Sequence, residues 1–213
     1  MKVTANEIDC AISTIDMVRK DAQSNPRYGF DYGWGTFSKI MRLLTSQSSG
    51  GRIQNYIFES LGWTSVPSSE GRGDVKNNLG QYFEVKTTMI TTSNGSMNIV
   101  QIRLWQNISG YHVFVIDTLK NNALTHFFLS KSEMAEEVNL LGQSAHGTKS
   151  ANAENNNKEW AVRIRWGLGE DFERWIKKYK QDTHLDGREA TASIKICKDS
   201  DTPVLEYKSG VLR

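Results

Sequence analysis

The chain has 213 residues, 38% of them hydrophobic and 10% aromatic, and a formal net charge of +2 at pH 7. This hydrophobic content is sufficient for a core and excludes an intrinsically disordered chain, and the length is that of one domain with a small appendage. The mildly basic charge permits a nucleic-acid partner without requiring one. Cys10 and Cys197 are too few and too far apart for a disulfide framework, and neither has a metal-ligand neighbour.

The N-terminal residues lack the apolar stretch of a secretory signal. No apolar run approaches the ~18 residues that a membrane-spanning helix needs. We therefore expect a soluble, cytoplasmic protein.

Residues 1–47 are expected to form a helical part. Thr4 and Glu7 fit a capping box, and the apolar spacing that follows predicts a helix over about 5–22, whose stripe packs in a core or a dimer face. Residues 25–36 are rich in glycine and aromatic residues, which predicts a loop that either packs on the protein body or stacks on nucleobases. A short helix follows over 37–44.

An apolar stripe over 53–61 predicts a further helix that Gly62 ends. Ser48, Ser49 and two glycines stand at its expected start. Free backbone N–H groups there would bind an anion such as a DNA phosphate.

The stretch 71–88 predicts a β-hairpin, because glycines and an Asn-Asn-Leu-Gly turn separate two β-rich segments. Asp74 lies in the first strand. Glu84 and Lys86 lie in the second, on the face opposite its apolar side chains, which we expect to face a core. The turn folds Asp74 back beside them.

Two carboxylates beside an ammonium group suit metal-assisted phosphodiester chemistry. Mg²⁺ takes oxygen ligands and is commonly held by one or two carboxylates plus a substrate phosphate, where it polarises the phosphoryl oxygen and lowers the pKa of bound water. A lysine there can orient or deprotonate the attacking water. A solvated Glu-x-Lys face with an aspartate in a turn is the alternative interpretation.

The residues Asp74, Glu84, Val85 and Lys86 resemble the motif of the PD-(D/E)xK nuclease superfamily, which includes the type II restriction endonucleases; Gly73 stands where that motif has a loosely kept proline. The resemblance implies an α/β (α+β) fold with a restriction-endonuclease-like core, a mixed central β-sheet flanked by helices. It implies Mg²⁺, for which Mn²⁺ substitutes, bound at Asp74, Glu84 and Val85, with Lys86 serving the attacking water.

In some members of that superfamily the helix before the hairpin contributes a glutamate to the metal site. Glu59, fifteen residues before Asp74, is the candidate. A solvated glutamate on the polar face of the helix is the equal alternative. The order of helix, hairpin and further strands is the one that the core of the superfamily requires.

An Asn-Gly pair at 94–95 between β-rich runs predicts a second hairpin. We expect a strand through Arg103 and a short helix to Ile108, with a crossover helix over 98–109 as the alternative. On a strand, Gln101 and Arg103 share a face, where they contact DNA or are solvated.

A nearly continuous apolar run over 111–118 is typical of a strand buried on both faces of a central sheet. Another strand is expected over 123–129. Ser130 and Glu133 fit a second capping box, which begins a helix that stops at Gly142.

The polar stretch 143–158 predicts a loop that contacts DNA, where His146, Thr148 and Lys149 suit phosphates; a mobile surface loop is the alternative.

Residues 159–166 alternate, with apolar side chains toward the core and Arg163 and Arg165 on the other face, either along a DNA backbone or in solvent. A basic amphipathic helix over 170–181 follows. Two closing strands are expected over 191–198 and 204–211.

We therefore predict a single nuclease domain over 1–213, with a C-terminal β appendage over 185–213. The resemblance implies a homodimeric, sequence-specific endonuclease that cuts double-stranded DNA to 5′-phosphate and 3′-hydroxyl ends, accompanied by a DNA methyltransferase. Arg52 and Arg72 are further candidates for DNA contacts. A structure-selective nuclease (junction resolvase or repair nickase) and a catalytically inert DNA-binding module are the alternatives.

Overall fold

The computed structural model describes residues 3–77, 79–144, 159–183, 185, 192–195 and 204–207. The chain divides into two compact units, one formed by residues 1–57 and 185–213 and the other by residues 58–184. No helix among the described residues is long and apolar enough to span a membrane.

The first unit is mainly helical. Its elements are α1 (Ala5–Ser24), a 3₁₀ helix (Phe30–Tyr32), α2 (Gly33–Met41), α3 (Ser46–Ser60, which continues into the second unit) and an antiparallel pair of β10 (Ala192–Lys195) with β11 (Val204–Tyr207). The capping box at Thr4 and Glu7 is confirmed. On α1 only Thr14, Val18 and Ala22 are buried, whereas Ile8 and Ile12 are 49% and 52% exposed.

Two expectations for this unit are corrected. The helix expected over 37–44 begins earlier, at Gly33, because Phe37 and Tyr56 stack at 4.3 Å and hold the preceding aromatic segment in helical form. The expected anion site at the start of α3 is wrong: the helix begins at Ser46, so the Ser49 N–H is already bonded to the carbonyl of Thr45.

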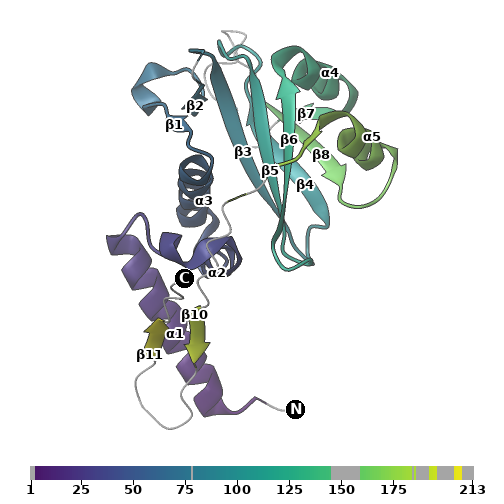
Figure 1. Cartoon of the computed structure of the whole chain (residues 1–213). Coiled ribbons are helices and arrows are strands. Elements are labelled where there is room, and N and C mark those ends of the chain that lie inside the picture. Colours follow the sequence, from purple (N-terminus) through teal and green to yellow (C-terminus); the bar gives the residue numbers. More distant parts are fainter. Residues whose placement is uncertain are drawn as a thin grey trace. The chain divides into compact units, whose positions relative to one another are not determined.

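The second unit is built on a mixed six-stranded sheet (Figure 1). Its strands, in spatial order, are β1 (Thr64–Ser65), β2 (Val75–Lys76), β3 (Tyr82–Ile90), β5 (Gly110–Asp117), β6 (Ala123–Ser130) and β9 (Lys180–Gln181). β3 and β5 are parallel, and every other neighbouring pair is antiparallel. The prediction of a mixed central sheet flanked by helices is confirmed; the likeness to a restriction-endonuclease core stays a prediction.

A second sheet has the order β4 (Ser96–Ile102), β8 (Trp160–Arg165) and β7 (Gly142–Ser144). The predicted turn at 94–95 exists, but the predicted hairpin is wrong. The strand after the turn, β4, pairs with β8 in the second sheet and does not pair with β3. In this position β4 buries its apolar side chains Met97, Ile99 and Ile102 in the core. The short helix expected before Ile108 is also absent, and residues 103–109 form an irregular loop with a turn at 104–105.

The main core lies between the central sheet, the second sheet and two helices, α4 (Lys131–Leu141) and α5 (Glu170–Tyr179). In Figure 1, α4 and α5 lie beside β7 and β8. From the central sheet, Tyr111, Val113 and Phe127 enter this core. Side chains at alternate positions, such as Phe114, are buried on the opposite face, so β5 is buried on both faces as predicted.

Candidate active site

The predicted hairpin places Asp74 directly before β2. The Asp74 N–H donates to the Phe83 carbonyl over 2.8 Å, and its carbonyl accepts from the Val66 N–H over 2.8 Å. Gly73 makes this approach possible: its φ is +69°, and a Cβ at that position would lie 2.6 Å from the Phe83 carbonyl oxygen. A glycine is required there for steric reasons. This explains why position 73 holds a glycine where the nuclease motif has a proline.

The Asp74 carboxylate takes the place of a missing backbone partner. β2 pairs with β3 only at Tyr82 and Phe83, so beyond that point no strand of the described part of the chain pairs with β3 on this side. Oδ2 of Asp74 accepts a hydrogen bond from the Val85 N–H over 2.8 Å. The N–H and C=O of one residue point to the same side of a strand, so the Val85 carbonyl lies on the same edge of β3 as its N–H.

Glu84 and Lys86 are joined on one face of β3. Nζ of Lys86 donates to Oε1 of Glu84 over 2.7 Å. Glu84 is 6% exposed. We expected the face that carries Glu84 to be the open one, but the sheet is covered on both faces, and Glu84 shares its face with the core residue Tyr111, its partner in β5.

The electrostatics indicate a strained pair of carboxylates. Burial raises the pKa of Asp74, and the negative charge of Glu84 raises it further; the Val85 N–H, Lys86 and Arg103 oppose this only in part. Burial also raises the pKa of Tyr111, again with help from Glu84. Titratable groups perturbed by burial together with a specific charged neighbour are candidates for functional residues.

The donor set fits a hard divalent cation. Asp74 and Glu84 supply two carboxylates, and Val85 supplies a carbonyl on the same side. Among the described residues no group of three or more His, Cys, Asp or Glu side chains could hold a metal. The fit therefore rests on two carboxylates, a backbone oxygen and exchangeable ligands, a mixture that Mg²⁺ commonly accepts.

Glu59 is exposed on the last turn of α3. Gly62 ends this helix with a φ of +65°, and the Trp63 N–H bonds back to the Phe58 carbonyl, as the sequence predicted. The role of Glu59 at the metal site stays a prediction.

The predicted DNA-contacting residues have different surroundings. Arg72 is exposed, with its guanidinium 5.7 Å from the centre of the Tyr82 ring, and Arg163 and Arg165 are exposed on β8. Arg52 donates from Nη2 to the carbonyl of Ala22, a bond within the first unit. His146, Thr148 and Lys149 lie outside the described residues.

Gln101 and Arg103 do not share a strand face. The register of β4 against β8 shifts between Ile99 and Ile102, and Gln101 has a φ of +55°, as in a β-bulge. Gln101 is exposed, whereas Arg103 lies just beyond β4 and its Nε donates to Oε1 of Glu159 over 2.7 Å. Bulges of this kind re-aim side chains and are common next to active sites.

Sequence reasoning missed two residues near the carboxylates. The Oη of Tyr111 donates to the Arg103 carbonyl over 3.1 Å, which ties the loop after β4 to the strand beside Glu84. Glu159 holds Arg103. An aromatic residue at the start of a buried strand and a glutamate before another strand carry no local signal of this arrangement.

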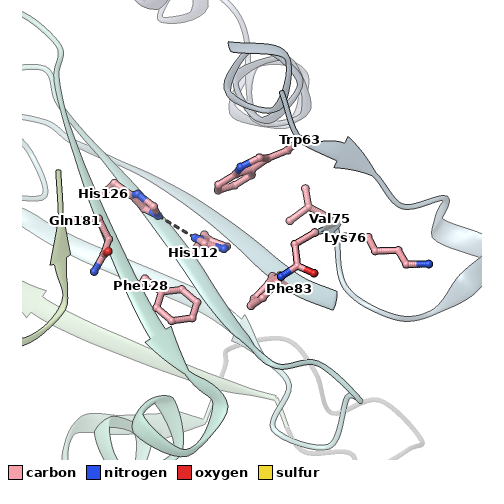
Figure 2. Close-up of a pocket in the computed structure, with 9 residues that line it drawn as sticks. Trp63, Val75, Lys76, Phe83, His112, His126, Phe128 and Gln181 are labelled. Carbon is pink, nitrogen blue, oxygen red and sulfur yellow. Dashed lines mark hydrogen bonds between the residues drawn. The ribbon is translucent and has the colours of Figure 1, made fainter. Parts of the chain in front are cut away.

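The opposite face of the central sheet holds a cavity of about 290 Å³ (Figure 2). His112 and His126 line it, with Nδ1 of His112 3.0 Å from Nε2 of His126. Figure 2 shows Trp63 and Phe83 around the two imidazole rings, while Lys76 points away from them. Phe83 lines this cavity and its neighbour Glu84 lies on the other face, so the cavity and the carboxylate site are on opposite faces.

The chain matches no protein-family model. It matches no curated protein either.

Proposed function

We propose that this protein is a Mg²⁺-dependent endonuclease of the type II restriction kind, which hydrolyses double-stranded DNA to 5′-phosphate and 3′-hydroxyl ends. The observation that carries the proposal is the meeting of three side chains: the Asp74 carboxylate bonded to the Val85 N–H, beside Glu84 bonded to Lys86. A buried carboxylate, Glu84, and a half-buried one, Asp74, repel each other and favour a cation between them.

Each residue has a role in this proposal. Asp74, Glu84 and the Val85 carbonyl would hold Mg²⁺, or Mn²⁺ in its place. The bound ion supplies Lewis-acid stabilisation of the phosphoryl oxygens and a more acidic water. Lys86 orients the attacking water and offsets negative charge that develops at phosphorus.

The proposal extends to the partners. The exposed Arg72, Arg163 and Arg165 would contact phosphates, because exposed arginine side chains are the usual sequence-independent contacts to DNA. A homodimer would match a palindromic site, and a companion DNA methyltransferase would protect the host sites.

The test is a plasmid-cleavage assay with and without Mg²⁺. Wild-type protein should give discrete fragments only when Mg²⁺ is present. Asp74→Ala should lower the rate by at least about 100-fold, because it removes both a cation ligand and the acceptor for the Val85 N–H. Asp16→Ala, at an exposed position on α1, is the matched control and should cut like the wild type.

Other outcomes separate the alternatives. Cutting of four-way junctions but not of plasmids would replace the restriction-enzyme proposal with a resolvase. Equal rates for Asp74→Ala and wild type would contradict the site assignment. Binding of DNA without cleavage of any substrate would favour an inert DNA-binding module.

A further inference from the structure

Arg103 and Glu159 form an ion pair where the loop after β4 begins, and Tyr111 links this loop to the strand beside Glu84. Arg103 directly follows β4 and Glu159 directly precedes β8, and the pairing of Ile102 with Trp160 brings them together across 56 positions of sequence. Their side chains are only 32% and 12% exposed. An ion pair this sheltered is held in one geometry more firmly than one in open solvent.

The backbone of Arg103 is fixed against the strand that carries the site. The Oη of Tyr111 donates to the Arg103 carbonyl over 3.1 Å, and the Gln106 N–H donates to the same oxygen over 3.1 Å. Tyr111 is the partner of Glu84 in the parallel pairing of β5 with β3. Burial and Glu84 raise the pKa of Asp74, and the positive charge of Arg103 acts in the opposite direction and lowers it.

The remaining donors of Arg103 are available. Within the described part of the chain, only the Nε of Arg103 makes a side-chain hydrogen bond, so both Nη groups are without a partner there. An arginine held through Nε presents its two Nη groups as a rigid, planar fork that suits a phosphate.

Glu159 has an unusual feature of its own. Its Oε2 atom is buried and has no hydrogen-bond partner among the described residues. A bidentate pair would satisfy this oxygen with an Nη group of Arg103, but only the Nε bond is made. A buried carboxylate oxygen without a partner is costly, so its retention in a folded protein requires an explanation, and a catalytic role is one of those known.

We propose that Glu159 positions Arg103 to bind a non-bridging oxygen of the phosphodiester that the Asp74–Glu84 site cuts. Arg103 would be the substrate-binding residue, and Glu159 a positioning residue that fixes the guanidinium plane through Nε. This inference rests on the proposed endonuclease function and adds to it a cationic contact with the scissile phosphate.

The experiment compares Arg103→Ala, Glu159→Ala, the double variant and Glu159→Gln in the full-length chain. One assay measures kcat and KM for Mg²⁺-dependent plasmid cleavage, and a second measures binding of a fluorescent duplex without metal. Circular dichroism and thermal melting report whether each variant folds. The matched control is Glu136→Ala. Glu136 lies on α4, and the substitution removes only its exposed ion pair with Lys178 of α5.

Arg103→Ala should lower kcat about 100-fold, as loss of one preorganised donor does. Glu159→Ala should lower kcat about 10-fold or more with a smaller change in KM. The double variant should match Arg103→Ala, because Glu159 acts only through Arg103. Glu159→Gln should retain most of the activity, since its amide oxygen still accepts from Nε, and Glu136→Ala should behave as wild type.

Wild-type kinetics for Glu159→Ala, or effects of the two alanine variants that multiply in the double variant, would overturn the inference while leaving the nuclease function intact. If the wild type binds duplex DNA but cuts nothing, the proposed function fails. The inference about the scissile phosphate falls with it, and the binding assay then reports only whether Arg103 and Glu159 act together in DNA binding. If the wild type neither binds nor cuts DNA, both proposals fall.

Discussion

Two histidines on the sheet face opposite the carboxylates have strongly lowered pKa values. His112 and His126 are hydrogen-bonded to each other, and Nδ1 of His126 is within hydrogen-bond distance of Oγ1 of Thr183. Burial and the neighbouring His126 lower the pKa of His112 to about 3, and burial lowers the pKa of His126 to about 4. Both rings are therefore neutral at pH 7 and remain neutral in mild acid.

This pair predicts a specific loss of stability in acid. In the unfolded chain a histidine takes up a proton near pH 6.5, whereas these two do so only near pH 3 to 4 when folded. Between those values the unfolded state binds more protons, so the free energy of unfolding falls as the pH is lowered. From pH 7 to pH 5 we expect a loss on the order of 2 kcal/mol per histidine.

Urea denaturation at pH 7 and pH 5 measures this loss. The variant His112→Phe keeps an aromatic ring in the cavity and removes one titrating group, so it should lose about half as much stability as the wild type over the same pH interval. An identical pH dependence for variant and wild type would show that other groups cause the loss.

At the scale of single residues, the sequence predicted only part of the candidate site. Glu84 lies ten positions after Asp74, and Lys86 two positions after Glu84. The four-residue turn at 77–80, between Asp74 and Glu84, is enough to predict that the three side chains come close together. Glu159 could not be found this way, because its contact with Arg103 depends on a strand pairing across 56 positions. The bulge at Gln101 likewise has no signal in the alternation of side chains.

At the scale of elements, Glu137 joins α4 to α5. Its carboxylate accepts hydrogen bonds from Arg174, from the indole N–H of Trp175 over 2.8 Å and from the hydroxyl of Tyr179 over 2.9 Å. Glu137 is 1% exposed. Burial acts to raise its pKa, but these donors outweigh burial and hold the pKa below its usual range.

The variant Glu137→Ala should therefore destabilise the protein by about 3 kcal/mol, because it leaves the Trp175 and Tyr179 donors buried without an acceptor and removes the partner of Arg174. Glu136→Ala, one residue earlier, loses only an exposed ion pair at 3.4 Å and should cost less than about 0.5 kcal/mol. Denaturant unfolding of both variants checks the difference. Equal effects would contradict the structural role given to Glu137.

The elements that were predicted well are those with local signals. The capping boxes at Thr4 and Ser130 fixed the starts of α1 and α4, and the apolar run of β5 fixed a central strand. β4 was placed in the wrong sheet, because an Asn-Gly turn determines where the chain reverses but not which strand becomes its partner. The start of α2 was missed because contacts with Tyr56, nineteen residues after Phe37, stabilise it.

At the scale of the whole molecule, the mixed sheet is what creates the site. β3 and β5 run parallel, which sets Glu84 beside Tyr111, while β2 stops early and leaves one side of β3 open to Asp74. The composition predicted a protein with a core, and the family resemblance implied its α/β fold with a mixed central sheet. The division into two compact units has no comparable signal, since no linker rich in glycine or proline separates them.

The central claim is that Asp74 and Glu84 together bind one divalent cation, and it can be tested without knowing which DNA sequence is cut. Isothermal titration calorimetry of the full chain with Mn²⁺ is the direct measurement. We predict one site per chain for the wild type and for the surface control Asp16→Asn. Asp74→Asn should lower the affinity by about 10- to 100-fold, since one charged ligand is lost. Unchanged Mn²⁺ binding by Asp74→Asn, or no binding by the wild type, would contradict the account.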